Sequence, residues 1–471
     1  MEAFDGRPIE KANCLQADRL TLKDTIAQSF GFLAPVMSIA YLTPLIAGGA
    51  GGAVPLAIIL GGIGVIAIGL IIARFAMRYP HAGAFYEYTR RAYGPVPGFI
   101  SGWVYFFGTY MLSTAIMAGI GGFVSALFAQ YKINVPWIPI TVAIAVIAFA
   151  LGYFDVRIAT RAQLGIILVS MTLVALFSIY VIFRAGSANS VHPFLVSSSP
   201  TGLSGIAFGM IYAFLIFAGF ESSATLAEET KNPHRALPIT IVVTVALAVL
   251  YYVLTSYAQA IGFGAAHADQ WATSPSPLFF IGQKFGNDFI VLVLNVAAIV
   301  DAIGVAIACS VAATRLLYSL GRDGVVPKIV GSTHPKHKTP WVSALVVLGS
   351  GLIIDLALSG MGALPEFGFL SGIGGLAIIL VYLSVAISGF TLDRGKKFSI
   401  FKTGVLSVVG IFFTGFAIYA SVWPVPPYPQ NLMPYVLLGW IAIGGVLVAV
   451  HKRNKVPAMM AENLAVDSGA K

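Results

Sequence analysis

The sequence predicts an all-α integral membrane protein with about twelve transmembrane helices, from its composition, its apolar stretches and the placement of its basic residues. Of its 471 residues, 58% are hydrophobic and only 10% are charged, and the mean hydropathy is +0.87. This composition excludes a water-soluble globular fold. A helix needs roughly 20 mostly apolar residues to cross about 30 Å of hydrocarbon, and such stretches recur from residue 25 to residue 450.

Polar or proline-containing breaks separate these stretches and set the expected helix boundaries. All connections between them are short, so we expect no separate soluble domain. The predicted helices lie near 25–49, 54–78, 96–129, 136–153, 161–183, 203–228, 236–263, 286–320, 340–360, 365–391, 403–424 and 432–451.

The basic residues predict the orientation of the chain. With the N-terminus in the cytoplasm, all 28 Lys and Arg residues except Lys132, Arg184 and Lys284 fall on the cytoplasmic side. This is the asymmetry that the positive-inside rule describes. It predicts a multi-pass protein of the cell membrane with both termini in the cytoplasm. It also accounts for the net charge of +9 without a nucleic-acid partner.

Two of the predicted helices contain residues that interrupt helices. The first contains Pro35 and Pro44, and the sixth contains Gly219, two residues before Glu221. These would be the first helices of two five-helix halves with opposite orientation. No repeat is visible between the halves at the level of residues, so the symmetry is inferred from topology alone. Broken helices at matching positions of inverted halves indicate a transporter's midplane binding site.

An opened helix offers charge-selective backbone groups at mid-membrane depth. The N-terminal end of the following half-helix attracts a carboxylate, and the C-terminal end of the preceding one attracts a cation. An amino-acid zwitterion presents both charges, so backbone groups alone could bind it. The alternative is that these Gly and Pro residues only kink the helices or allow close packing.

Three motifs carry a resemblance to a known family. They read TyrProHisAlaGlyAlaPheTyrGluTyrThrArgArgAlaTyrGlyPro at 79–95, PheAlaGlyPheGluSerSerAlaThrLeuAlaGluGluThrLysAsnProHisArgAlaLeuPro at 217–238, and ThrArgLeuLeuTyrSerLeuGlyArgAspGlyValValProLys at 314–328. In amino acid permeases of the amino acid, polyamine and organocation (APC) superfamily, these segments resemble the segment between helices two and three, the helix-six signature with the loop after it, and the end of helix eight. The match in helix count and topology extends over nearly the whole chain.

The resemblance implies a LeuT-type fold, in which two inverted five-helix repeats are followed by two extra helices. Substrate would lie between broken helices one and six. The implied divisions are a cytoplasmic N-terminal segment (1–24), helices one to five (25–184), helices six to ten (203–391), helices eleven and twelve (402–452) and a cytoplasmic tail (453–471).

The resemblance also implies which positions face the substrate. Where the family has a Gly-Ser-Gly-like break, this chain has Met37, Ser38 and Ile39, so only the serine is retained. An apolar, aromatic-lined pocket without a basic group favours a neutral or apolar side chain on the substrate. The implied substrate-binding residues are Pro35, Val36, Met37, Ser38, Ile39, Phe106, Phe217, Ala218, Gly219, Phe220 and Cys309.

Acidic residues at hydrocarbon depth are candidates for coupling or gating, because ionising one there costs roughly 2.5–3.5 kcal/mol. Glu221 either titrates as the outer side of the site opens and closes, or satisfies free backbone N–H groups. Asp301 either binds ion or substrate, or makes an interhelical hydrogen bond. For Asp355, packing or a water contact is expected. Some proton-coupled family members carry a Lys in helix five, where this chain has Ser170. Ser170 is either an oxygen ligand of a cation or a packing residue.

We therefore expect a secondary transporter of amino acids that works by alternating access, as a proton symporter or an exchanger. A carrier of polyamines or other organic cations is the alternative within the same fold, and the coupling ion, H⁺ or Na⁺, stays open. A channel or a membrane enzyme is less favoured, because neither a pore stripe nor clustered catalytic residues are evident. No cofactor or metal site is expected, and the seven His residues fall in loops or at helix ends. The expected partners are a small-molecule substrate and the lipid bilayer; the sequence predicts no oligomeric state.

Overall fold

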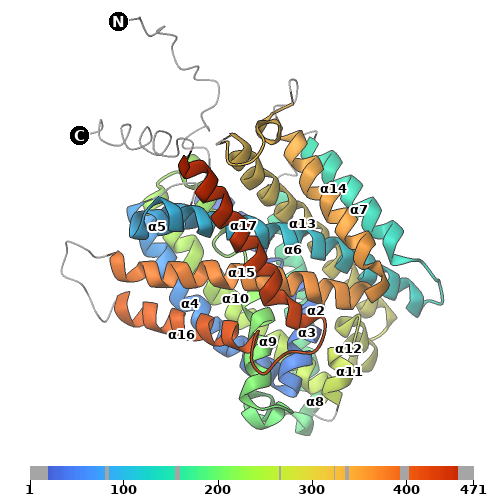
Figure 1. The fold of residues 1–471 in the computed structure, drawn as a ribbon. Coiled ribbons are helices and arrows are strands. Elements are labelled where there is room, and N and C mark those ends of the chain that lie inside the picture. The colour runs from blue at the N-terminus through green and yellow to red at the C-terminus, as the bar shows by residue number, and fades with distance from the viewer. Residues whose placement is uncertain are drawn as a thin grey trace, which may run out of the picture.

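The computed structural model describes residues 20–79, 84–153, 160–264, 267–322, 324–334, 339–392 and 403–453, and the regular elements in these ranges are helical (Figure 1). An isolated bridge pairs Leu20 with Thr230. The prediction of an all-α protein is confirmed. Most of the predicted N-terminal segment, nearly all of the predicted tail and part of the 79–95 motif lie outside the described residues.

Eight of the described helices are long and apolar enough to cross a membrane, and three shorter apolar helices accompany them. The α-helices of the described residues are α1 (Leu22–Leu33), α2 (Pro35–Tyr41), α3 (Thr43–Ala50), α4 (Val54–Arg78), α5 (Ala84–Tyr93), α6 (Pro95–Gln130), α7 (Trp137–Tyr153), α8 (Thr160–Ala185), α9 (Leu203–Leu215), α10 (Pro233–Phe263), α11 (Ala268–Ala272), α12 (Pro277–Phe285), α13 (Asp288–Arg322), α14 (Trp341–Leu358), α15 (Ala363–Ser388), α16 (Val405–Ala420) and α17 (Met433–Arg453).

Two predicted helices are interrupted in the structure. The stretch 25–49 is divided into α1, α2 and α3. α1 ends because Ala34 has φ 42° and the following Pro35 has no N–H to continue the ladder, and a turn at Leu42 separates α2 from α3. The stretch 203–228 is α-helical only as far as Leu215; Gly219 then adopts φ 109°, and a 3-10 helix follows from Ser222 to Glu229. We call residues 33–35 the first break and residues 216–221 the second break.

The interior of the bundle is built around α6 and α15, which pack along each other and are largely buried. Helices α7 and α14 lie side by side at one edge, and α16 packs against α4 and α15 (Figure 1). Helices on the outside carry exposed apolar side chains such as Phe183 and Leu250. This arrangement suits a bundle surrounded by lipid tails, where exposed apolar surface has no cost.

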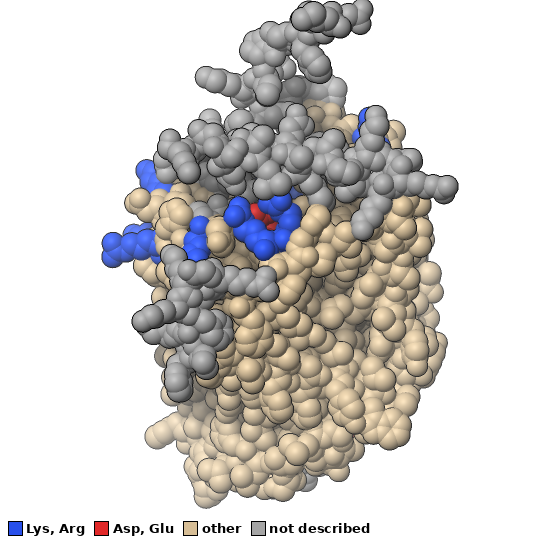
Figure 2. Space-filling view, turned by 60° about the vertical axis from the view of Figure 1, so that its left-hand side comes forward, with Lys and Arg blue, Asp and Glu red and all other residues tan. Residues whose placement is uncertain are grey.

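One end of the bundle carries a network of basic residues. The guanidinium of Arg74 donates to Thr403 Oγ1 at 2.7 Å, Arg78 donates to the carbonyl of Leu392, and His234 Nδ1 pairs with the carbonyl of Met77 at 2.8 Å. On the face drawn in Figure 2, the Lys and Arg side chains gather at one end, and most of the remaining surface is uncharged. We call this end, where α4 and α15 end and α10 begins, the basic end.

Candidate functional site

The first break leaves two backbone donors at the start of α2. Pro35 has no N–H, and the N–H of Ser38 already donates to the carbonyl of Ala34 at 2.9 Å, which begins the helical ladder. The N–H groups of Val36 and Met37 are therefore the free donors of this helix end. The carbonyl of Leu33, before the break, accepts from Ser38 Oγ at 3.0 Å and from the Tyr252 hydroxyl at 3.5 Å.

Asp301 of α13 satisfies both free donors. Its Oδ2 atom accepts the N–H of Val36 at 2.9 Å and the N–H of Met37 at 3.0 Å, and the residue is only 5% exposed. A helix N-terminus favours a negative charge, so the α2 backbone dipoles stabilise this carboxylate. An internal carboxylate thus occupies the place at which the sequence predicted a substrate carboxylate.

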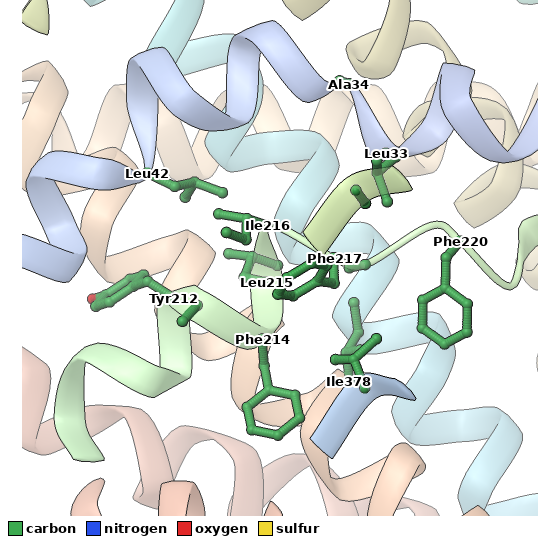
Figure 3. Packing of buried hydrophobic residues seen from close by; sticks show 14 of the residues in the cluster. Leu33, Ala34, Leu42, Tyr212, Phe214, Leu215, Ile216, Phe217, Phe220 and Ile378 are labelled. Atoms are coloured by element: carbon green, nitrogen blue, oxygen red, sulfur yellow. The ribbon is translucent and has the colours of Figure 1, made fainter. Parts of the chain in front are cut away.

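The second break lies directly against the first. A Cβ atom on Gly219 would lie 2.9 Å from the backbone nitrogen of Leu33, which is closer than real side chains come. Ser29 Oγ in α1 donates to the carbonyl of Phe220 at 2.9 Å. In Figure 3 the segment from Leu215 to Phe220 lies between Leu33 of the first break and Ile378, a residue of α15. Gly219 is required here for both its positive φ and its lack of a side chain.

Glu221 connects the second break to α15. Its Oε2 atom accepts the N–H of Gly219 at 3.0 Å and the hydroxyl of Tyr382 at 3.0 Å, and the residue is 1% exposed. Its Oε1 atom has no hydrogen-bond partner among the described residues. The side chain therefore holds the freed backbone of the second break while one oxygen stays available.

A small central cavity lies between the two breaks. Its volume of about 30 Å³ accommodates a water molecule or two and is far below the roughly 300–1,000 Å³ of ordinary ligand sites, so it has no room for a substrate in this structure. Four of the expected binding residues line it: Met37, Ser38, Ala218 and Cys309. The remaining lining is mainly apolar and comes from Phe32, Leu33, Ala34, Leu42, Leu112, Ile116, Leu215, Val305, Phe367 and Ser371.

A larger cavity of about 270 Å³ lies beyond the central one, away from the basic end. Phe367 of α15 lines both cavities. The ring of Tyr41 lies edge-on to Phe367 at a centroid distance of 5.8 Å and stacks on Phe123 at 4.5 Å. Phe367 therefore lies between the two cavities, and Tyr41 and Phe123 line the larger one.

Several of the expected site residues lie away from the central cavity. Phe106 packs in a separate cluster with Trp103 and Leu317, and its ring stacks on Tyr110. Phe217 and Phe220 are fully buried in the main core, and Ser170 is buried in α8 without lining the cavity. Pro35, Val36 and Ile39 lie in α2, where Val36 contributes its backbone N–H. Asp301 reaches the site through that backbone contact.

Sequence reasoning missed three residues around the breaks: Tyr252, Tyr382 and Phe367. Both tyrosines lie in the middle of predicted membrane helices, and a Tyr hydroxyl at that depth needs a hydrogen-bond partner. This was a usable signal. Phe367 carried none, because one more Phe in an apolar helix looks like any packing residue.

A family model and several known relatives match most of this chain. Residues 20–444 match the family described as amino acid permease. The branched-chain amino acid permease BcaP of Bacillus subtilis is 25% identical, with 86% of this chain and 87% of the relative covered. The methylthioribose transporter of the same organism is 24% identical with the same coverage, and the low-affinity putrescine importer PlaP of Escherichia coli is 28% identical over 75% of this chain and 80% of the relative.

Solved structures support the fold. A manganese transporter of Eremococcus coleocola superimposes with a TM-score of 0.56 and 13% sequence identity, covering 93% of this chain and 97% of the other. At that identity the likeness concerns the fold alone. The family and these relatives are transporters and not enzymes, and several long apolar helices make the chain a multi-pass membrane protein. With a family match that spans nearly all of its length, the chain belongs to the amino acid permease family.

Proposed function

We propose that this protein is a secondary transporter that moves amino acids across the cell membrane by alternating access, as a proton symporter. The observation that carries the proposal is the Asp301 carboxylate on the N–H groups of Val36 and Met37. The two five-helix halves would span 25–184 and 203–391, followed by helices in 402–452. The basic end would face the cytoplasm together with both termini.

The coupling follows from competition between two carboxylates. The substrate carboxylate and the ionised Asp301 require the same two N–H groups, so they exclude each other. When Asp301 takes up a proton, it loses the charge that α2 stabilises, and the N–H groups become free for the substrate. Proton and amino acid would therefore bind together and leave together.

The lining of the central cavity restricts the polarity and charge of the substrate side chain. Its walls are mostly apolar, and its polar lining groups are Ser38, Cys309 and Ser371. Among the described residues, no Lys or Arg lines it. These features favour a small neutral or apolar amino acid once the helices open to admit it.

A carrier of organic cations is the second candidate, and Asp301 is also the observation that favours it. In that case the carboxylate would stay on α2 and would pair with a substrate ammonium group. Putrescine is the named substrate of one relative of this chain, which makes a diamine a suitable probe.

A set of related ligands separates the two candidates. Thermal stability of the purified protein would be measured with leucine, with isopentylamine, which is leucine without its carboxylate, and with putrescine. Uptake of any stabilising ligand into proteoliposomes would follow, with a proton gradient, with a sodium gradient and with none. We expect leucine-like amino acids to stabilise the protein and a proton gradient to drive their uptake. Stabilisation by the amines alone would replace the first candidate with the second, and uptake only against a counter-substrate would establish exchange.

A further inference from the structure

Two acidic side chains meet in the interior, outside the site described above. Asp355 lies three residues before the end of α14, and Glu366 lies in the first turn of α15. They are 2% and 0% exposed. Their carboxyl groups lie within hydrogen-bonding reach of each other.

The four carboxyl oxygens of this pair have no hydrogen-bond donor among the described residues. An ionised carboxylate can only accept hydrogen bonds, so two ionised groups would face each other with neither able to donate. Their charges would also repel strongly in a medium of low dielectric. A hydrogen bond between the two groups requires a proton on one of them.

No Lys, Arg or His among the described residues donates a hydrogen bond to either carboxyl group. Helices α6, α7, α14 and α15 contain no Lys, Arg or His. Of the charged residues of α13, Asp301 is bonded to the first break and Asp288 lies in the first turn. Arg315 and Arg322 belong to the last part of α13. The chain that follows α13 contacts the beginning of α14, where Ser343 donates to the Val330 carbonyl, whereas Asp355 lies near the end of α14.

Three tyrosines approach this region, and none donates to the pair. The hydroxyl of Tyr110 lies 2.7 Å from Ser350 Oγ; because Ser350 donates to the Val346 carbonyl, Tyr110 is the donor to Ser350. Tyr212 donates to the carbonyl of Gly368 at 3.0 Å. Tyr41 presents its ring to Phe367.

We propose that Asp355 and Glu366 form a proton-binding site in which the two carboxyl groups share one proton. The site stands apart from the Asp301 coupling scheme and does not depend on it. Glu366 immediately precedes Phe367, the residue that separates the two cavities. Loss of the shared proton would place two negative charges between α14 and the start of α15 and would weaken the contact that holds Phe367 in place.

The test is the pH dependence of thermal stability in the purified full-length protein. The wild-type Tm is expected to fall by several degrees as the pH rises through the titration of the pair. D355N and E366Q are expected to lose this alkaline fall, because an amide N–H donates in place of the proton and one charge is gone. S350A is the matched control on the same helix; it removes a hydroxyl without a titratable group and should keep the wild-type slope. Equal slopes in all four proteins would overturn the proposal.

Infrared spectroscopy covers the case in which D355N and E366Q do not fold. In a D301N/E221Q background the carbonyl stretch of a protonated carboxylic acid should persist at neutral pH and disappear at alkaline pH; its absence at neutral pH contradicts the proposal.

Sodium is tested separately by comparing the Tm in sodium chloride and choline chloride. No difference is expected, and a sodium-specific rise that E366Q abolishes would assign the site to sodium instead of a proton.

Discussion

The side chain of Asp301 accepts a hydrogen bond of 3.0 Å from the backbone N–H of Met37. The two residues are 264 positions apart in the sequence, and the same oxygen also accepts the N–H of Val36. A single carboxylate from α13 thus caps the helix that begins at the first break. The proposed coupling of proton and substrate depends on this contact.

D301N should separate substrate binding from the proton gradient. The amide oxygen can still accept the two N–H bonds, but without charge, so we expect a modest stability loss of about 1 kcal/mol. Substrate affinity should become independent of pH, and a proton gradient should no longer stimulate uptake into proteoliposomes. D288N, on the exposed first turn of the same helix, is the control and should behave like the wild type. Proton-driven uptake by D301N at the wild-type rate would remove Asp301 from the coupling.

G219A should destabilise the protein strongly. The substitution meets an unfavourable φ of 109° and a contact of 2.9 Å with the Leu33 nitrogen, which together should cost about 3 kcal/mol or more. G415A is the matched control, since a Cβ there meets nothing within 4 Å and Gly to Ala favours a helix by up to about 1 kcal/mol. Thermal unfolding in detergent measures both. A G219A protein as stable as G415A would contradict the described contact between the breaks.

E221A should be less stable than E221Q. Alanine leaves the Gly219 N–H and the Tyr382 hydroxyl without an acceptor, at a cost of about 1–3 kcal/mol, whereas the Gln amide oxygen can accept both. Uptake by E221Q should then follow the wild-type pH profile, because Asp301 carries the proton in the proposed scheme. An altered pH profile in E221Q, with stability retained, would assign Glu221 to coupling.

F367A should connect the central cavity with the larger one. We expect Cys309, which lines the central cavity, to react with a membrane-impermeant maleimide several-fold faster in a C14S/F367A protein than in C14S alone. F412A, which removes an exposed ring on α16, serves as the control. F367L keeps most of the volume and should give an intermediate rate. Equal labelling rates in all of these variants would mean that Phe367 does not separate the cavities.

Glu87 should contribute stability that is lost in acid. Burial raises the pKa of Glu87, but hydrogen bonds from Arg90 and Arg91, together with their charges, outweigh burial and lower its pKa below the ordinary value. A lowered folded-state pKa means that the stabilisation is complete above the ordinary value, near 4.3, and disappears as the pH falls through the folded-state value. The Tm of the wild type should therefore drop more steeply below about pH 4.3 than that of E87Q. Parallel acid profiles would show that these ion pairs add nothing.

The apolar pattern predicted most helix boundaries closely, as α4 and α7 show. It did not predict α5 as a separate helix, because Glu87, Arg90 and Arg91 interrupt any apolar run and the helix is amphipathic. The Pro35 and Gly219 signals located both breaks. Those signals reflect local backbone chemistry, which a sequence displays directly.

Contacts between distant helices were beyond the sequence. The sequence predicted that Asp301 binds ion or substrate or makes an interhelical hydrogen bond, but no pattern identified the Met37 backbone as its partner. The sequence does not distinguish Glu366 as a buried residue, because it stands at the start of a predicted helix, where an acidic side chain is ordinary. The structure begins α15 at Ala363, buries Glu366 and brings its carboxyl group to that of Asp355.

The close approach of Gly219 to Leu33 bears on how the protein can move. Two backbones in direct contact cannot separate without opening a void or stranding polar groups, and the bond from Ser29 to the Phe220 carbonyl adds to that cost. The two irregular segments would therefore travel as one rigid body. The cavity would then open to one side of the membrane or the other because the surrounding helices slide and tilt against this unit.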